Sequence, residues 1–224
     1  MATKTRKQTT AGKQADPSQK IISAYMDHVL TEKKQPASVY AFAKKAGITE
    51  KEFYNHFTSF ADIDNTIWDQ AGEQTINTLA SSKEYEAYNT REKILGFFYT
   101  QQEALNENRS FYIYSLKTHQ PMYRNLKSFR TRVEDFSKMV IQQGLADKEL
   151  EERKFISDRY HDVVWMNTLF ILNFWAKDES PGFEKTDAAI EKSVNLMLEL
   201  MGRSALDSML DLGKFMLQNM MKRN

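Results

Sequence analysis

The histidines of this chain are its most obvious candidates for metal or acid–base chemistry, but their spacing supports neither. They are His28, His56, His119 and His161. No two of them have the i, i+4 separation that puts two ligands on one helix face, and none lies in a recognisable ligand motif with a carboxylate. The 224-residue chain contains no cysteine, which excludes disulfides, thiolate metal sites and a cysteine nucleophile. We therefore expect no metal site.

The sequence also contains no motif that holds an activated nucleophile or a phosphate-bearing cofactor. A G-x-S-x-G elbow, a P-loop and a G-x-G-x-x-G turn are all absent. We expect no catalytic residue and no cofactor, and we expect that the protein is not an enzyme.

Charge is unevenly distributed along the chain, although the net charge is only +1. The residues up to Phe57 include ten Lys and Arg against five Asp and Glu, whereas the remainder includes 21 against 25. A basic front and an acidic back indicate one end that faces a polyanion. A solvated, lysine-rich terminus has the same composition, so charge alone leaves both interpretations open.

The segment Ser38–Phe57, SVYAFAKKAGITEKEFYNHF, predicts two short helices joined by a turn. Ser38 is a favourable N-cap for a helix over Val39–Ala46. Gly47 can adopt the positive φ of the turn. Thr49 and Glu52 have capping-box spacing at the start of the second helix.

Small and apolar residues in this segment suit two helices that pack closely. Ala43 is small where the helices approach, and Ile48 and Phe53 would pack the second helix onto the first. This is helix-turn-helix geometry, whose second helix enters the major groove of DNA. A corner between two helices inside a protein core has a similar pattern.

The rest of the chain is also periodic at helical spacing. A helix opens at Pro17 and ends before Lys33–Pro36, and Gly144 closes a later helix. Further helices are predicted over Ala61–Leu79, Arg91–Asn106, Ser110–His119, Met122–Gln143, Lys148–Lys177, Thr186–Met201 and Ala205–Met221. With only eight glycines and four prolines, the chain is predicted to be all-α, with nine to ten helices.

The segment Ser38–Phe57 resembles the N-terminal domain of the TetR family of transcriptional regulators. The run AGITEKEFYNHF is similar to the family signature A-G-V-S-x-x-x-L-Y-x-H-F. The residues that carry the resemblance are Ser38, Ala43, Lys44, Ala46, Gly47, Ile48, Thr49, Phe53, Tyr54, His56 and Phe57. The helix before the segment and the helix after it complete the arrangement expected of such a head.

The resemblance implies a three-helix DNA-binding head on a larger helical ligand-binding and dimerisation domain. We expect a disordered basic tail over 1–16, the head over 17–60 and the larger domain over 61–224. The implied partners are a double-stranded DNA operator, a second copy of the chain and a small apolar or amphipathic ligand. Helices 148–177 and 186–201 would form the homodimer interface. The implied function is a ligand-responsive regulator, more often a repressor than an activator, and we expect it to be cytoplasmic.

The same resemblance implies which side chains contact DNA. Ser38 and Thr49 would hold phosphates at helix N-termini, and Tyr54 and His56 would contact backbone phosphates. Lys51 and Asn55 would reach bases or phosphates, joined by Tyr40 and Lys44. Hydroxyl, amide and amine groups suit these roles.

Two departures from the family pattern weaken the DNA-binding interpretation. Glu50 and Glu52 begin the second helix, where small or basic residues are common, and a carboxylate near phosphates opposes binding unless it accepts from a cytosine amine. The residues after Phe57 read TSFAD and lack the basic character usual there. DNA affinity would then depend on Lys44, Lys45 and the basic tail.

Aromatic residues in the middle helices predict core packing for most and a ligand pocket for a few. We assign Phe98, Tyr112, Tyr114, Phe136 and Trp165 to that pocket because they lie in the middle of predicted helices.

The last predicted helix has a methionine-rich apolar face. Three roles are open for this face: packing on the protein itself, binding another protein, or lying on a membrane surface. The run D-x-S-P-x-F-E at Asp178–Glu184 resembles a TetR-fold lipid-binding protein of ubiquinone biosynthesis. A lipid-binding or accessory protein that no longer binds DNA is therefore the alternative function.

Overall fold

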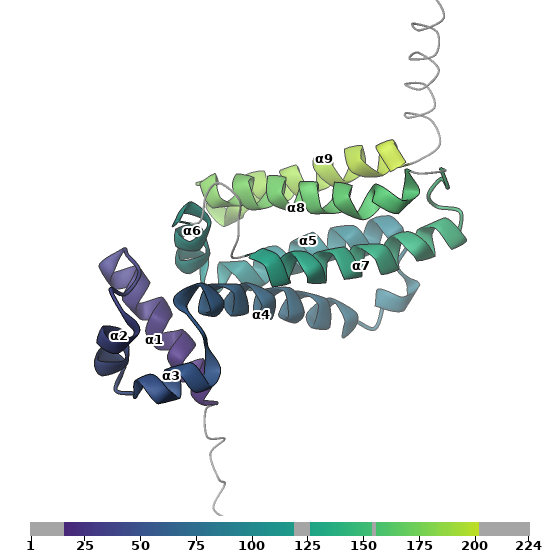
Figure 1. The fold of residues 1–224 in the computed structure, drawn as a ribbon. Helices are drawn as coiled ribbons and strands as arrows, with labels where there is room; N and C mark the ends of the chain where they lie inside the picture. Colours follow the sequence, from purple (N-terminus) through teal and green to yellow (C-terminus); the bar gives the residue numbers. More distant parts are fainter. Residues whose placement is uncertain (1–15, 119–125, 154–155, 202–224) are drawn as a thin grey trace, which may run out of the picture. The chain divides into compact units, whose positions relative to one another are not determined.

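The computed structural model describes residues 16–118, 126–153 and 156–201, which fold into α-helices and short 3₁₀ turns without a strand (Figure 1). Nine α-helices lie in these ranges, so the predicted all-α class is confirmed. The predicted tail over 1–16, apart from Asp16, and the methionine-rich helix Ala205–Met221 lie outside the described residues.

The N-terminal unit consists of α1 (Pro17–Glu32), α2 (Val39–Ala46), α3 (Glu50–His56) and the start of α4 (Phe60–Ala80). Aromatic rings fill its core. Tyr25 stacks on Phe60 with ring centroids 5.6 Å apart, and Phe53 meets Phe42 and Phe60 edge-on at 6.0 and 5.6 Å. Each of the four helices contributes at least one of these buried rings, so the core holds α2 and α3 in a fixed relation.

The C-terminal unit is a bundle of the rest of α4 with α5 (Thr90–Asn106), α6 (Arg109–Thr118), α7 (Lys127–Ala146), α8 (Tyr160–Lys177) and α9 (Glu184–Met201). In this bundle α8 packs on α7 and α9 packs on α5, and α8 and α9 lie side by side (Figure 1). The Arg132 guanidinium of α7 holds the carboxylate of Asp69 on α4 through two hydrogen bonds. The division between the two units falls between Ile63 and Asp64, inside α4.

The predicted helix Lys148–Lys177 is wrong before Tyr160, where α8 begins after a 3₁₀ turn at Ser157–Arg159. Lys148 has φ 61°, and the backbone N–H groups of Glu149 and Leu150 both donate to the carbonyl of Gly144. These bonds end α7 and turn the chain back toward α9, where the N–H of Glu151 donates to the carbonyl of Met201. Helical spacing of the side chains does not reveal such a reversal.

Gly144 does not close the helix before it, as the sequence predicted, because α7 continues to Ala146. A β-carbon at this position would lie 2.2 Å from the hydroxyl oxygen of Thr90 and 3.2 Å from the side chain of Leu150. Gly144 is therefore required by close packing of α7 against the start of α5, not by turn geometry.

Candidate functional site

The turn between α2 and α3 is built by hydrogen bonds within the segment Ser38–His56. The Ser38 hydroxyl caps α2 by accepting from the N–H of Ala41 at 3.1 Å. Gly47 has φ 66° and ψ 38°, a left-handed conformation that glycine adopts without strain. The N–H of Ile48 then donates to the carbonyl of Ala43 at 3.0 Å, which fixes the direction in which α3 leaves the turn.

A capping box fixes the start of α3. The Thr49 hydroxyl accepts from the N–H of Glu52 at 3.1 Å, and the Glu52 carboxylate accepts from the N–H of Thr49 at 2.6 Å and from its hydroxyl at 2.8 Å. The backbone hydrogen bond from Thr49 is the main reason that the pKa of Glu52 lies below its ordinary value. The carboxylate of Glu52 is thus occupied within the protein.

All eight residues that the sequence assigned to DNA contact are exposed on this motif: Ser38, Tyr40, Lys44, Thr49, Lys51, Tyr54, Asn55 and His56. The aromatic rings are unusually open for their type, with 63% of Tyr40 and 56% of Tyr54 exposed. Phe53 of α3 and Phe57, directly after it, are buried, so α3 presents polar side chains outward from an anchored apolar face. The hydroxyls of Ser38 and Thr49 already serve as caps.

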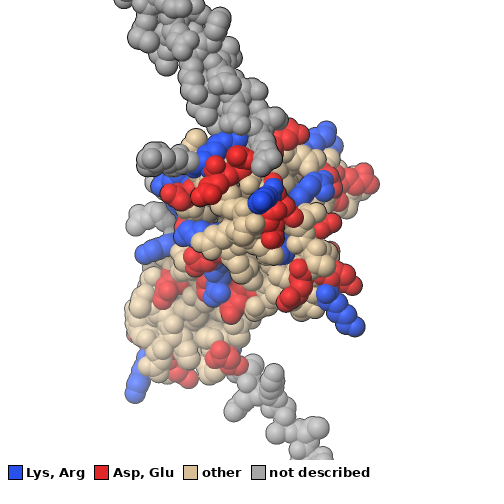
Figure 2. Space-filling model, turned by 90° about the vertical axis from the view of Figure 1, so that its right-hand side faces the viewer, with Lys and Arg blue, Asp and Glu red and all other residues tan. Residues whose placement is uncertain are grey.

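The charge of the N-terminal unit is balanced over its described residues 16–63, which contain six Lys and six Asp or Glu. Lys45 is paired with Glu32 at 2.9 Å, whereas Lys44 and Lys51 form no ion pair with the described part of the chain. The sequence before residue 16 adds Lys4, Arg6, Lys7 and Lys13. In the view of Figure 2, acidic and basic side chains are interspersed over the C-terminal unit.

Of the five aromatic residues assigned to a ligand pocket, all but Tyr114 belong to two packed groups of rings in the C-terminal unit. Phe98 and Phe136 both pack on Phe97, Phe136 as a stacked ring at 4.8 Å. Tyr112 lies 4.8 Å from Trp68, and Trp165 packs on Phe129 at 6.2 Å. Tyr114 is half-buried, and the other four are buried. Burial raises the pKa of Tyr112 far above its ordinary value.

Two glutamines on α5 are functional candidates that the sequence analysis missed. Gln101 and Gln102 are buried, and neither Nε2 of Gln101 nor Oε1 of Gln102 has a hydrogen-bond partner among the described residues. They lie three and four positions after Phe98, so they follow it by one helical turn. Buried polar atoms normally have hydrogen-bond partners. These two atoms are therefore available to a polar group of a bound ligand.

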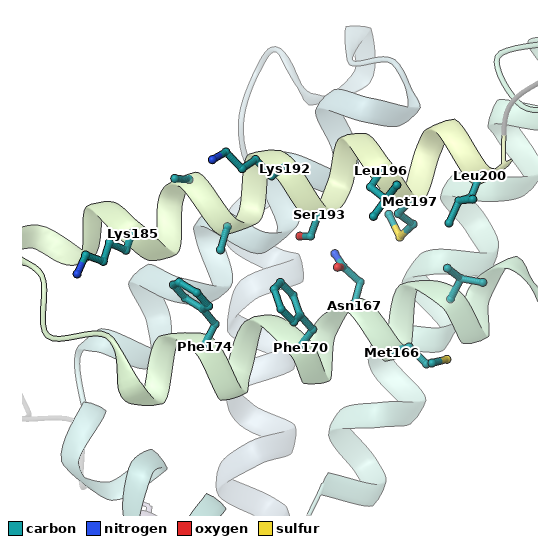
Figure 3. Close-up of a pocket in the computed structure, with 13 residues that line it drawn as sticks. Met166, Asn167, Phe170, Phe174, Lys185, Lys192, Ser193, Leu196, Met197 and Leu200 are labelled. Atoms are coloured by element: carbon teal, nitrogen blue, oxygen red, sulfur yellow. The ribbon is translucent and has the colours of Figure 1, made fainter. Parts of the chain in front are cut away.

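An apolar groove of about 710 Å³ lies between α8 and α9 in the C-terminal unit. In Figure 3, Asn167, Phe170 and Phe174 rise from α8 toward α9, and Leu196, Met197 and Leu200 point from α9 toward α8. Met166 is 69% exposed and Leu196 59% exposed, values that are high for such apolar side chains. Lys185 and Lys192 lie along its edge on α9.

The connection from α8 to α9 is held by Asp178, at the start of the D-x-S-P-x-F-E run. One carboxylate oxygen accepts from the N–H and hydroxyl of Ser180, and the other accepts from the N–H and hydroxyl of Thr186, at 2.6–2.8 Å. Arg109 of α6 donates to the carbonyls of Trp175 and Asp178, and its guanidinium lies 4.8 Å from the ring centre of Phe183. This run therefore has a structural explanation within the fold.

Neither a metal-binding cluster nor a helix able to cross a membrane occurs within the described ranges. No three His, Asp or Glu side chains gather there in a way that could hold a metal ion. Likewise, none of the helices within residues 16–118, 126–153 and 156–201 has the length and apolar character needed to span a membrane.

Comparison with known proteins places the chain in a family. Residues 93–216 match the family model described as tetracyclin repressor-like, C-terminal domain. A search of curated protein sequences finds no match to this chain.

Solved structures with the same fold cover both units. A putative TetR-family transcriptional regulator from Syntrophomonas wolfei is 19% identical, with a TM-score of 0.62 over 83% of this chain and 94% of that one. The fatty acid degradation regulator FadR from Bacillus halodurans is 16% identical, with a TM-score of 0.55 over 84% and 97%. The TetR-family transcriptional regulator PfmR from Thermus thermophilus is 16% identical, with a TM-score of 0.51 over 78% and 97%.

The family model covers more than half of the chain, and the similar structures share its all-helical fold. The chain therefore belongs to the TetR family of transcriptional regulators.

Proposed function

We propose that this protein is a ligand-responsive regulator that binds a DNA operator as a homodimer and represses transcription. The observation that carries the proposal is the exposed polar surface of α3 and of the start of α2, mounted on an aromatic core. A short helix of this kind can enter the major groove, where Lys51 and Asn55 would reach base edges or phosphates. Tyr40, Tyr54 and His56 would contact the backbone.

The four basic residues before residue 16 complete this proposed interface. Because the described head has no net charge, attraction to phosphates requires another source of positive charge. Lys4, Arg6, Lys7 and Lys13 provide it in the sequence next to α1. Binding should therefore weaken steeply as salt concentration rises.

The homodimer would form through the groove between α8 and α9. An open apolar groove with Met166, Phe170 and Leu196 on its walls is costly to leave in water, and a second copy offers the same surface in return. Of the helices that form it, α8 lies within the segment 148–177 and α9 contains the segment 186–201, the two segments that the family resemblance assigned to dimerisation.

The ligand would be a small apolar or amphipathic molecule bound near Phe98, Tyr112, Tyr114, Phe136 and Trp165. Support comes from Gln101 and Gln102, because a ligand with both an acceptor and a donor would satisfy their unpartnered atoms. Since this region is closely packed, binding of a ligand would have to move side chains. Ligand binding would lower the affinity of the protein for DNA. Because such coupling is reciprocal, DNA binding would lower the affinity for the ligand by the same factor.

The direct test is a fluorescence-anisotropy titration of the full chain with duplex DNA from its own upstream region, at low and moderate salt. We expect tighter binding to this DNA than to a scrambled duplex, with a steep salt dependence. Lys51→Ala should weaken binding about tenfold or more. Lys138→Ala removes an exposed lysine of α7 and should leave binding unchanged.

Equal, weak binding to both duplexes would contradict DNA recognition and favour the alternative, a TetR-fold lipid-binding or accessory protein. The acidic residues Glu50 and Glu52 are the observation that favours that alternative. Its test is binding of the full chain to vesicles that contain anionic lipid.

A further inference from the structure

The two carboxylates at the start of α3 differ in what they do. The carboxylate of Glu52 accepts from the N–H and the hydroxyl of Thr49 and completes the capping box. Glu50 is exposed and forms no hydrogen bond or ion pair with any described residue. Its side chain is therefore not needed for the fold of the head, although it is the first residue of α3.

A free carboxylate at this place has a cost if α3 approaches DNA. It repels phosphates, so it lowers affinity for every sequence equally. The carboxylate strengthens binding only where the major groove presents a hydrogen-bond donor, since an ionised carboxylate can accept but not donate. Guanine presents N7 and O6 as acceptors and thymine presents O4 as an acceptor. Adenine presents its N6 amino group beside the acceptor N7, which repels a carboxylate, whereas cytosine presents the N4 amino group without a neighbouring acceptor.

We propose that Glu50 determines sequence specificity by accepting a hydrogen bond from the N4 amino group of a cytosine at one fixed position of each half-site. The proposal rests on the DNA-binding function proposed above and adds the base that is read. Helix-turn-helix proteins direct the first turn of the second helix at base edges, and Glu50 begins that turn. Glu50 would then reject guanine and thymine at this position, because each faces it with acceptors alone.

The test is selection of binding sites from a randomised duplex library by the full chain and three variants. The wild-type chain should enrich sites with cytosine at one position of each half-site. Glu50→Ala should lose the preference at that position, by about tenfold or more, and keep it elsewhere. Glu50→Gln should change the preference to adenine, because a glutamine amide pairs with N6 and N7 of adenine.

Glu52→Gln is the matched control. It removes one negative charge from the same turn, but glutamine can still accept from the N–H of Thr49 and preserve the capping box. It should therefore keep the cytosine preference while binding all DNA somewhat more tightly. Circular dichroism should give wild-type helical content for each variant, since the carboxylate of Glu50 has no partner in the described fold.

Two negative outcomes are distinguishable. Enrichment of a defined site by the wild-type chain, with an unchanged base preference in Glu50→Ala and Glu50→Gln, would overturn this inference and leave the proposed function intact. Failure of the wild-type chain to enrich any sequence would overturn the DNA-binding function itself.

Discussion

Asp178 connects two helices through both oxygens of one carboxylate. Four hydrogen bonds from Ser180 and Thr186 converge on it, and the side chain is buried. Burial by itself raises the pKa of Asp178, but these hydrogen bonds outweigh burial and hold the pKa far below its ordinary value. The ionised form is thus the one that the folded protein stabilises.

The pH dependence of stability follows from that sign. A carboxyl group whose pKa is lower in the folded than in the unfolded chain contributes stability above its unfolded pKa, near 3.9, and loses it as the pH falls further. We expect Asp178→Asn to reduce the free energy of unfolding at pH 7 by roughly 2 kcal/mol. The difference between wild type and variant should shrink below about pH 4.

Urea unfolding at pH 7, 5 and 3 measures this difference. Asp135→Asn is the control, because Asp135 is exposed and its nearest ion-pair partner, Lys138, is 3.8 Å away. A difference that stays constant down to pH 3 would show that the charge of Asp178 is not what the fold requires.

At the scale of elements, the contact between α5 and α7 depends on the absence of one side chain. Gly144 lies inside α7 where the hydroxyl of Thr90 and the side chain of Leu150 approach it. The carboxylate of Glu149 also accepts from the N–H of Thr90 at 2.7 Å, so the turn that follows α7 caps the start of α5. A larger residue at position 144 would separate the two helices.

Gly144→Ala should destabilise the C-terminal unit by about 1–3 kcal/mol, because the new methyl group overlaps the hydroxyl of Thr90. The double variant Gly144→Ala, Thr90→Ala should recover part of that loss, since it removes the overlapping oxygen. Thermal unfolding of the wild type, both single variants and the double variant measures the coupling. Strictly additive effects would mean that the helices do not meet as described.

The sequence predicted α2, α4, α5 and α6 within one residue at each end, because capping residues and apolar spacing mark those helices locally. It failed at the start of α8, where hydrogen bonds to the end of α7 and to α9 decide the backbone path. Such contacts between distant segments leave no periodic signal. For the same reason the role of Gly144 was misjudged, since a glycine that permits packing and a glycine that ends a helix look alike in sequence.

The candidate site was predictable only in part. The exposed residues of α2 and α3 form a compact motif whose members are close in sequence, so its pattern could be recognised. Gln101 and Gln102 could not be identified, because the lack of a partner is a property of the packed body. The groove was equally hidden, because Phe170 and Leu196 have the spacing of ordinary core residues.

At the scale of the whole molecule, the groove between α8 and α9 predicts the state of association. A glutamate at Phe170 would place a charge among apolar side chains on the groove wall. We expect the wild-type chain to sediment at twice its 26.1 kDa mass and Phe170→Glu to sediment as a monomer. Because a monomer has only one copy of α3 to place in the major groove, its affinity for the operator should also fall.

Sedimentation velocity provides the measurement, with Met139→Glu as the control. Met139 is also an exposed apolar residue, but it lies on α7 outside the groove. Dissociation of both variants, or of neither, would assign the dimer contact to a different surface.

The positions of the three tryptophans have a spectroscopic consequence. All three tryptophans, Trp68, Trp165 and Trp175, lie buried in the C-terminal unit. Among fluorescent side chains the head contains tyrosine but no tryptophan. Arg130 lies over the ring of Trp165 and Arg109 over that of Trp175, so two indoles sit beside a cation. Tryptophan emission therefore reports on the C-terminal unit and does not detect unfolding of the head. Unfolding of the head has to be followed by tyrosine emission or by helical ellipticity. A ligand that rearranges the body would change the emission colour without any label.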